Sequence, residues 1–145
     1  MPKVESLVAE YVELYVKMMK MMDRRMTQCG ASFARTRVLL VLFKFGEQRA
    51  TEIAERFSQS PRTVTEAIDA LERDGLVSRC PDPSDRRAKL IHITSKGIES
   101  LEKTEPMRQK FIAQTFGKLS DEEKSSFHHV IAKLNHAVDD MQNEG

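Results

Sequence analysis

Three cationic side chains between positions 85 and 89, with an acid beside them, have the types and spacing needed to hold a polyanion. Asp85, Arg86, Arg87 and Lys89 follow an Asp-Pro-Ser segment that is typical of a turn, and a run that is typical of a strand comes next. A guanidinium at the tip of a hairpin can enter the minor groove of DNA, whose negative potential attracts it. Asp85 could orient the Arg87 guanidinium by a charge-assisted hydrogen bond. The alternative is an ordinary solvated turn, since charged turns are common.

A second cluster lies on a helix predicted from residue 61 to residue 74. Ser60 is a candidate N-cap and Pro61 takes the favoured first position. If the apolar residues point inward, the first turn exposes Ser60, Arg62, Thr63, Thr65 and Glu66. Recognition helices contact base edges through such residues, and Arg56, on the preceding helix, is a candidate phosphate contact. Glu66 could accept from cytosine, but it also repels phosphate. A solvated helix face is the alternative for this helix taken alone.

The elements that position these clusters are short helices and a hairpin. Apolar spacing predicts helices over 4–26 (ending near Gly30), over 34–45 and from an N-cap at Thr51. Strands are predicted over 76–80 and 89–94. Thr94 is expected to cap a helix through about residue 101, with a kink or restart at Pro106. Ser120 and Glu123 form a capping box for the last helix. The order predicts a mainly α fold with a small β-hairpin, a winged helix-turn-helix between long helices whose apolar faces need each other or a second chain.

Composition limits the class of protein without identifying it. The chain has 145 residues, 40% hydrophobic and 31% charged, which is ordinary for a helix-rich globular protein. A net charge of +1 gives no bulk attraction to nucleic acid. Arg86, Arg87, Lys89 and Lys96 nevertheless form a basic patch without an intervening acid. The longest apolar run is far shorter than the roughly 20 residues of a membrane span, and no signal peptide is evident, so we expect a cytoplasmic protein.

Two stretches together resemble one family. The pattern D-x-R-x-x-L-x-x-I-T-x-x-G is filled by Asp85, Arg87, Leu90, Ile93, Thr94 and Gly97, and the run SPRTVTEAIDALERDGLVSR precedes it. Both are similar to the MarR family (multiple antibiotic resistance regulators). The resemblance implies a homodimer in which helices near 4–28 and 98–142 interlock. Residues 1–30 and 98–145 would form the dimerisation region, and residues 31–97 the winged helix-turn-helix.

The resemblance also implies a mode of action. Each recognition helix would enter a major groove of the DNA. Each hairpin, called the wing, would enter a minor groove, with Arg87 as the wing arginine and Asp85 as its orienting acid. Members usually repress transcription and release DNA on binding small phenolic or lipophilic compounds, or on thiol oxidation. The chain departs from the family at two positions. Many members carry a basic residue where Glu66 stands, which leaves base preference open, and Pro106 interrupts a helix that is usually continuous.

Other residues were weighed for effector, redox and metal chemistry. Met18 and Met22, with Val41 and Phe45, could line an effector pocket, although such a methionine stripe is more often dimer core. Cys29 and Cys80 are interpreted as small packing residues, with thiol sensing as the alternative. The histidines of the last helix are interpreted as solvated or interface residues. No metal, no cofactor and no catalytic motif is indicated, so we do not expect an enzyme.

The leading hypothesis is therefore a homodimeric transcriptional repressor that binds a palindromic operator in double-stranded DNA and is released by a small-molecule effector. One alternative is a winged-helix protein-interaction module, supported by the acids Glu66, Asp69 and Asp74 on the predicted recognition helix. The other is a regulator that senses oxidation through Cys29 or Cys80.

Overall fold

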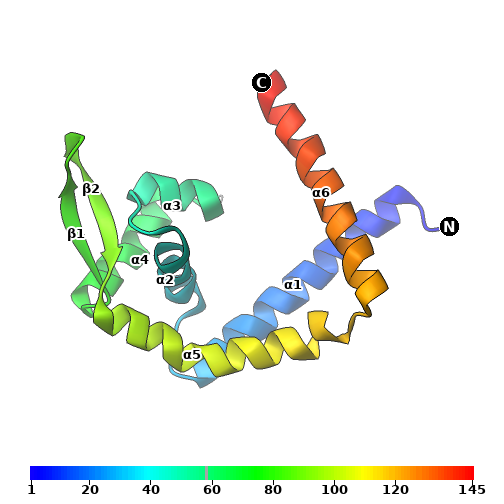
Figure 1. Ribbon diagram of the computed structural model, residues 1–145, viewed down its shortest axis with the longest axis horizontal. Helices are drawn as coiled ribbons and strands as arrows, with labels where there is room; N and C mark the ends of the chain where they lie inside the picture. Colours follow the sequence, from blue (N-terminus) through cyan, green and yellow to red (C-terminus); the bar gives the residue numbers. More distant parts are fainter. Residues whose placement is uncertain (58) are drawn as a thin grey trace. The chain divides into compact units, whose positions relative to one another are not determined.

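Helices dominate the computed structural model, which describes residues 1–57 and 59–145. In chain order the elements are α1 (Val4–Gln28), α2 (Phe33–Phe45), α3 (Ala50–Phe57), α4 (Pro61–Arg73), β1 (Val77–Asp82), β2 (Asp85–Ile93), α5 (Ser95–Gln114), the 3-10 helix η1 (Phe116–Lys118) and α6 (Asp121–Glu144) (Figure 1). The predicted fold class, mainly α with a small hairpin, is confirmed. The chain forms two compact units, Met1–Arg108 and Gln109–Gly145, which we call the first and second units.

The core of the first unit joins α2, α3, α4, the hairpin and the start of α5. It is made of aliphatic side chains from every one of these elements: Val38, Leu39, Val41, Leu42, Ile53, Ala54, Val64, Ile68, Leu71, Val77, Ile91 and Leu101. α2 contributes most because it is apolar on most sides, as expected, although Phe43 and Phe45 at its end are exposed. Burying these aliphatic faces removes the apolar surface that short helices cannot cover alone.

Short polar caps fix where the helices begin. The Ser60 hydroxyl accepts from the Thr63 amide, with Pro61 in the first turn of α4. Thr94 Oγ1 accepts from the Gly97 amide at the start of α5. These two predicted caps are confirmed.

Two other helix starts were also predicted from caps. The Ser120 hydroxyl accepts from the Glu123 amide, and the Glu123 carboxylate accepts from the Ser120 amide, which lowers the pKa of Glu123. This confirms the capping box of α6. The cap at Thr51 was wrong, because α3 begins at Ala50 and the Glu52 carboxylate accepts the Arg49 amide there.

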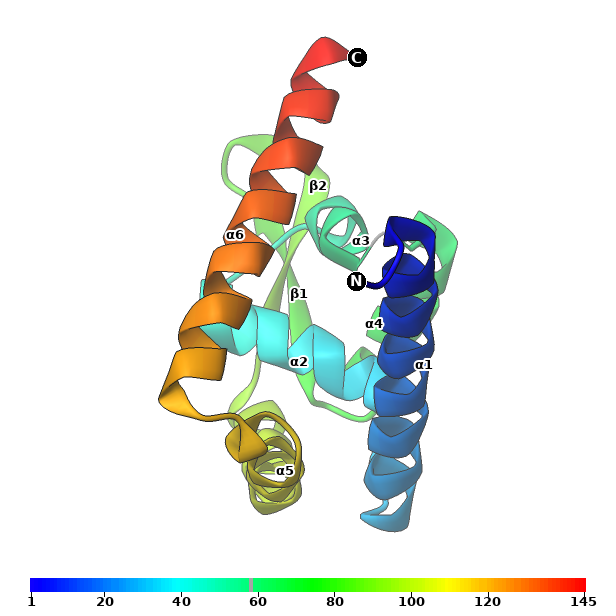
Figure 2. The same cartoon turned by 90° about the vertical axis from the view of Figure 1, so that its right-hand side faces the viewer.

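The hairpin is longer than predicted. β1 and β2 pair antiparallel from Val77↔Ile93 to Pro81↔Lys89, and the register then jumps to Asp82↔Asp85. The predicted loop between residues 80 and 89 is therefore mostly strand, because a bulge absorbs the residues that break the alternation. An isolated bridge between Gln48 and Ile91 adds a further strand position that was not predicted. Figure 2, turned by 90° from Figure 1, shows the hairpin within the same unit as α3 and α4.

Pro106 does not end its helix. α5 continues through it from Ser95 to Gln114, so the predicted restart was wrong. Proline removes the hydrogen bond to the carbonyl four residues earlier, that of Glu102, and its ring crowds the same carbonyl. Glu102 and Pro106 are both exposed, so water can bond to that carbonyl and the flanking turns can keep the helix intact.

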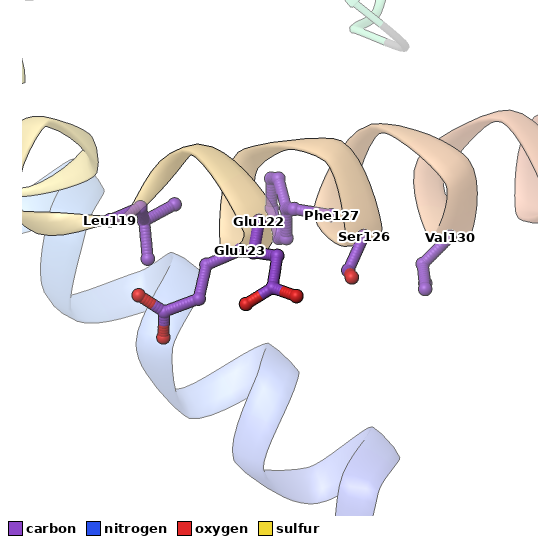
Figure 3. A pocket seen from close by; sticks show the side chains of 6 residues that line it. All are labelled: Leu119, Glu122, Glu123, Ser126, Phe127 and Val130. Carbon is purple, nitrogen blue, oxygen red and sulfur yellow. The ribbon is translucent and has the colours of Figure 1, made fainter.

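The second unit contains the end of α5, η1 and α6. The rings of Phe116 and Phe127 pack 5.9 Å apart at an interplanar angle of 49°. Beside them an open hollow of about 480 Å³ is lined by Leu119, Glu122, Glu123, Ser126, Phe127 and Val130, as Figure 3 shows. α6 has no buried residue, although it carries the predicted apolar face. Within the described residues, no helix is long and apolar enough to cross a bilayer.

Candidate nucleic-acid interface

α4 exposes the predicted recognition residues because its apolar face is fully used by the core. Val64, Ile68 and Leu71 are each at most 1% exposed. All five predicted residues on the outer face are exposed: Ser60, Arg62, Thr63, Thr65 and Glu66. The hydroxyls of Ser60 and Thr63 lie 2.9 Å apart and bond to each other, and Arg62 Nε donates to Glu66 at 3.4 Å. The terminal nitrogens of Arg62 keep donors for an external group.

Each acid on the outer side of α4 forms an ion pair with an arginine. Arg79 on β1 reaches Asp69 at 2.6 Å and Glu72 at 2.7 Å. Burial opposes the charge of Arg79, yet its pKa is raised because both carboxylates accept its hydrogen bonds. The remaining pairs are Arg62–Glu66 at 3.4 Å and Arg35–Asp74 at 3.2 Å. The acids that favoured a protein-interaction module are therefore largely neutralised within the fold.

The wing, defined here as the β1–β2 hairpin, presents its cations on a strand. Arg86 and Arg87 lie in the register gap of β2, where they have no paired residue on β1, and Lys89 is opposite Pro81. All three side chains are exposed. In residues 1–57 and 59–145, none of the three forms an ion pair with a carboxylate. Their positive charges are thus available to an external anion.

Asp85 acts differently from the prediction. Its carboxylate accepts from the backbone N–H of Arg87 at 3.0 Å, rather than from the Arg87 guanidinium. A carboxylate bonded to the amide two residues later is the geometry of an Asx turn. Asp85 therefore shapes the backbone that carries Arg87 and leaves the guanidinium itself without a carboxylate partner in the described chain.

Asp82 is the anchor of the wing tip, a role that the sequence reasoning missed. Its carboxylate accepts from the Ser84 amide at 2.9 Å and hydroxyl at 2.8 Å, and from Arg49 Nε at 2.9 Å and Nη2 at 2.6 Å. These bonds, led by the Ser84 amide, lower the pKa of Asp82 from 3.8 to about 2. The same carboxylate raises the pKa of Arg49. The Asp-Pro-Ser spacing could have indicated the Ser84 contact, but nothing in the sequence pointed to Arg49, far earlier in the chain.

Two other predicted cations have intramolecular contacts. Lys96 Nζ donates to the Asp74 carbonyl at 2.9 Å, so it binds the end of α4 and does not belong to the wing patch. The Arg56 guanidinium lies 3.7 Å from the centre of the Phe45 ring, a cation–π contact that leaves its N–H edge free to bind an anion. Arg56 is exposed, as a phosphate contact requires.

The candidate effector and redox residues differ in their exposure to solvent. Met18 and Met22 are half-buried on α1, Val41 is buried and Phe45 is exposed. None of the four lines the hollow on the second unit. Both cysteines are exposed, so interpreting them as packing residues was wrong. Among the described residues, no group of His, Cys, Asp and Glu is arranged to hold a metal ion.

Comparisons with known proteins agree with this geometry. The model of the MarR family matches residues 32–89. The HTH-type transcriptional repressor MdtR of Bacillus subtilis is 31% identical over 140 residues, which is 95% of this chain and 88% of MdtR.

Two solved structures share the fold. Sco3205, a MarR family transcriptional regulator from Streptomyces coelicolor in complex with DNA, has a TM-score of 0.80 and 23% identity. The match covers 94% of this chain and 91% of the Sco3205 chain. BpsR of Bordetella bronchiseptica, whose DNA binding is regulated by 6-hydroxynicotinic acid, has a TM-score of 0.75 and 22% identity. The match covers 92% of this chain and 93% of the BpsR chain. The exposed first turn of α4, the cationic wing that follows α4 in the chain and a 31% identical match over 95% of this chain lead to one conclusion: this chain belongs to the MarR family of transcriptional regulators, which are not enzymes.

Proposed function

We propose that the protein is a homodimeric, cytoplasmic repressor that binds a palindromic operator in double-stranded DNA. The observation that carries the proposal is the pair of guanidiniums of Arg86 and Arg87, exposed and without carboxylate partners in the described chain, on the hairpin that follows α4. The name of MdtR supports repression, and the complex of Sco3205 supports DNA as the ligand. A two-fold axis would give the operator its palindrome.

The contacts divide into two kinds. Ser60, Arg62, Thr63, Thr65 and Glu66 of the first turn of α4 would face base edges in the major groove. Asp85, Arg86, Arg87 and Lys89 would place the wing in the minor groove, and Arg56 would bind a phosphate. Changes at Arg62 would then alter base preference. Changes at Arg56 would mainly alter affinity and its salt dependence.

A mobility-shift assay on the DNA flanking the protein's own gene tests this assignment. Arg87→Ala should weaken binding by about 1–3 kcal/mol at matched salt. Binding should also fall steeply as salt is added, because bound phosphates release counterions. Unchanged affinity of Arg87→Ala, or binding that salt does not weaken, would contradict the proposal and favour a protein-interaction module.

Dimerisation would use residues 1–30 and 98–145, leaving residues 31–97 as the DNA-binding region. α1 and α6 expose many large apolar side chains, with Tyr11 at 66% and Leu134 at 62%. A helix whose apolar face is exposed in one chain is expected to bury it against another surface. The occupant that we propose is a second copy of the same chain.

Release from DNA by a small phenolic or lipophilic effector is the last part of the proposal. BpsR supports it, because 6-hydroxynicotinic acid regulates its DNA binding. We propose Met18, Met22, Val41 and Phe45 as the pocket, tested by Met22→Ala in the mobility-shift assay with a panel of phenolics.

Exposure of Cys29 and Cys80 favours a second candidate, thiol sensing. A Cys29→Ser/Cys80→Ser variant should then retain DNA binding after oxidant treatment that releases the wild type.

A further inference from the structure

Arg79 connects the two DNA-facing elements of the first unit. It stands on β1 of the wing, and its guanidinium reaches back to the outer face of α4. One nitrogen, Nη2, lies 2.6 Å from Asp69, and the other, Nη1, lies 2.7 Å from Glu72. A planar guanidinium that uses both terminal nitrogens on two carboxylates fixes direction as well as distance.

The burial of Arg79 sets it apart from the other cations in this region. Its side chain is 24% exposed, whereas the side chain of Arg62 is 89% exposed and its pair with Glu66 is 3.4 Å long. An exposed pair contributes little, because water and salt screen it. The contacts of Arg79 are shorter and use two carboxylates, so they define the direction of the guanidinium more closely, although both carboxylates are themselves exposed to solvent.

Core packing of Val77 and Ile91 and the bridge from Gln48 to Ile91 hold the base of the wing, and side-chain ion pairs add to these contacts. A two-stranded hairpin is marginal in stability when it stands alone, so its direction depends on what ties it to the rest of the unit. Near the tip, Asp82 binds Arg49 ahead of α3. Toward the base, Arg79 supplies the side-chain bonds from β1 to α4. The wing is thus tied to α4 and to the residue just ahead of α3, from two different positions of β1.

We infer that Arg79 is a positioning residue that locks the wing onto the recognition helix, so that Arg87 and Arg62 are presented to DNA as parts of one rigid body. This inference rests on the proposed function. In this role Arg79 contacts no DNA itself. By holding the two binding elements at a fixed separation, it spares the ordering cost that a loose wing would incur on binding.

The first test needs no DNA. In Arg79→Met, which keeps the apolar stem and removes the guanidinium, the amides of β1 and β2 should exchange hydrogen roughly tenfold faster, while those of α2 stay unchanged. Arg24→Met removes a guanidinium from an exposed site on α1 and serves as the control for the charge change. If Arg79→Met fails to fold, Asp69→Asn/Glu72→Gln removes the partners instead and should have the same effect. Hairpin exchange equal to that of the wild type would overturn the inference.

The second test uses an operator fragment and a double-mutant cycle. Arg79→Met should weaken binding roughly tenfold, and the further loss from Arg87→Ala should be smaller in that background than in the wild type, because a loose wing gains less from its arginine. Independent, fully additive losses would overturn the inference. Wild-type protein that binds no duplex would instead overturn the proposed function, and the exchange experiment would still decide the role of Arg79.

A third comparison separates positioning from simple neutralisation of acids. If Arg79 acted only by cancelling the charges of Asp69 and Glu72, the triple variant Asp69→Asn/Glu72→Gln/Arg79→Met would regain wild-type affinity. Positioning predicts that the triple variant stays as weak as Arg79→Met. Arg79→Lys should recover only part of the affinity, because one ammonium cannot bridge both carboxylates in a fork.

Discussion

At the scale of single residues, Asp82 gives the wing a dependence on pH. Its carboxylate is stabilised in the folded chain by the Ser84 amide and hydroxyl and by Arg49, and its pKa falls from 3.8 to about 2. A lowered folded-state pKa adds stability above the unfolded value, and this stability is lost as pH falls through the window from 3.8 to about 2. Asp82→Asn should therefore be less stable than the wild type at neutral pH, with a difference that shrinks through that window. Denaturant unfolding at a series of pH values measures it, and a difference independent of pH would contradict the assignment.

Close packing around Gly97 leaves no room for a side chain, which is also an effect of a single residue. A Cβ added there would lie 2.2 Å from the Leu76 carbonyl oxygen and 2.7 Å from a side-chain carbon of Ile93. Backbone cannot give way as a flexible side chain can, so Gly97→Ala should cost roughly 1–3 kcal/mol or more. Gly117→Ala is the matched control, because its nearest contact would be 3.4 Å. Thermal unfolding compares the two variants, and equal melting temperatures would show that the close approach does not matter.

At the scale of elements, α5 tolerates a proline at a cost. Pro106 leaves the Glu102 carbonyl without its helical donor, while the helix runs on to Gln114. Pro106→Ala should restore that hydrogen bond and raise the free energy of unfolding by on the order of 1–3 kcal/mol. Part of this gain is offset, because proline also stabilises the fold by restricting the unfolded chain. Calorimetry of the variant tests this. A lower melting temperature would mean that the proline sets a bend which packing requires.

At the scale of the whole molecule, the exposed apolar faces predict assembly. Leu134 lies on the apolar side of α6 and Ala132 on the opposite side of the same helix, and both are exposed in the single chain. Leu134→Glu should convert a dimer to monomer, because it places a charge in an apolar interface, whereas Ala132→Glu should not. Sedimentation or light scattering gives the mass. A dimer that survives Leu134→Glu would place the interface elsewhere, and a monomeric wild type would remove the basis for a palindromic operator.

Much of this architecture could be predicted from local patterns. Ser60 with Pro61, Thr94, and Ser120 with Glu123 announce helix starts, because a cap needs only residues within one turn. The exposure of Arg62 follows from apolar spacing on its helix, and that of Arg87 from its place in a charged turn. Errors arose where solvation of the backbone or pairing with another strand overrides the local signal. Pro106 does not break α5, and the loop predicted around Arg86 is mostly strand, because pairing with β1 compensates for a poor alternation.

The amino-acid sequence by itself determined the order of elements, the family and the exposed side chains that we propose to bind DNA, because each depends on short-range spacing along the chain. Only the tertiary structure decided how those side chains are held. The bonds of Arg79 to Asp69 and Glu72, and of Arg49 to Asp82, were set when separate elements met. The bond of Asp85 to the Arg87 amide is a local turn contact. The physical reason is that an ion pair forms wherever folding brings opposite charges within about 4 Å, and separation along the sequence does not record that distance.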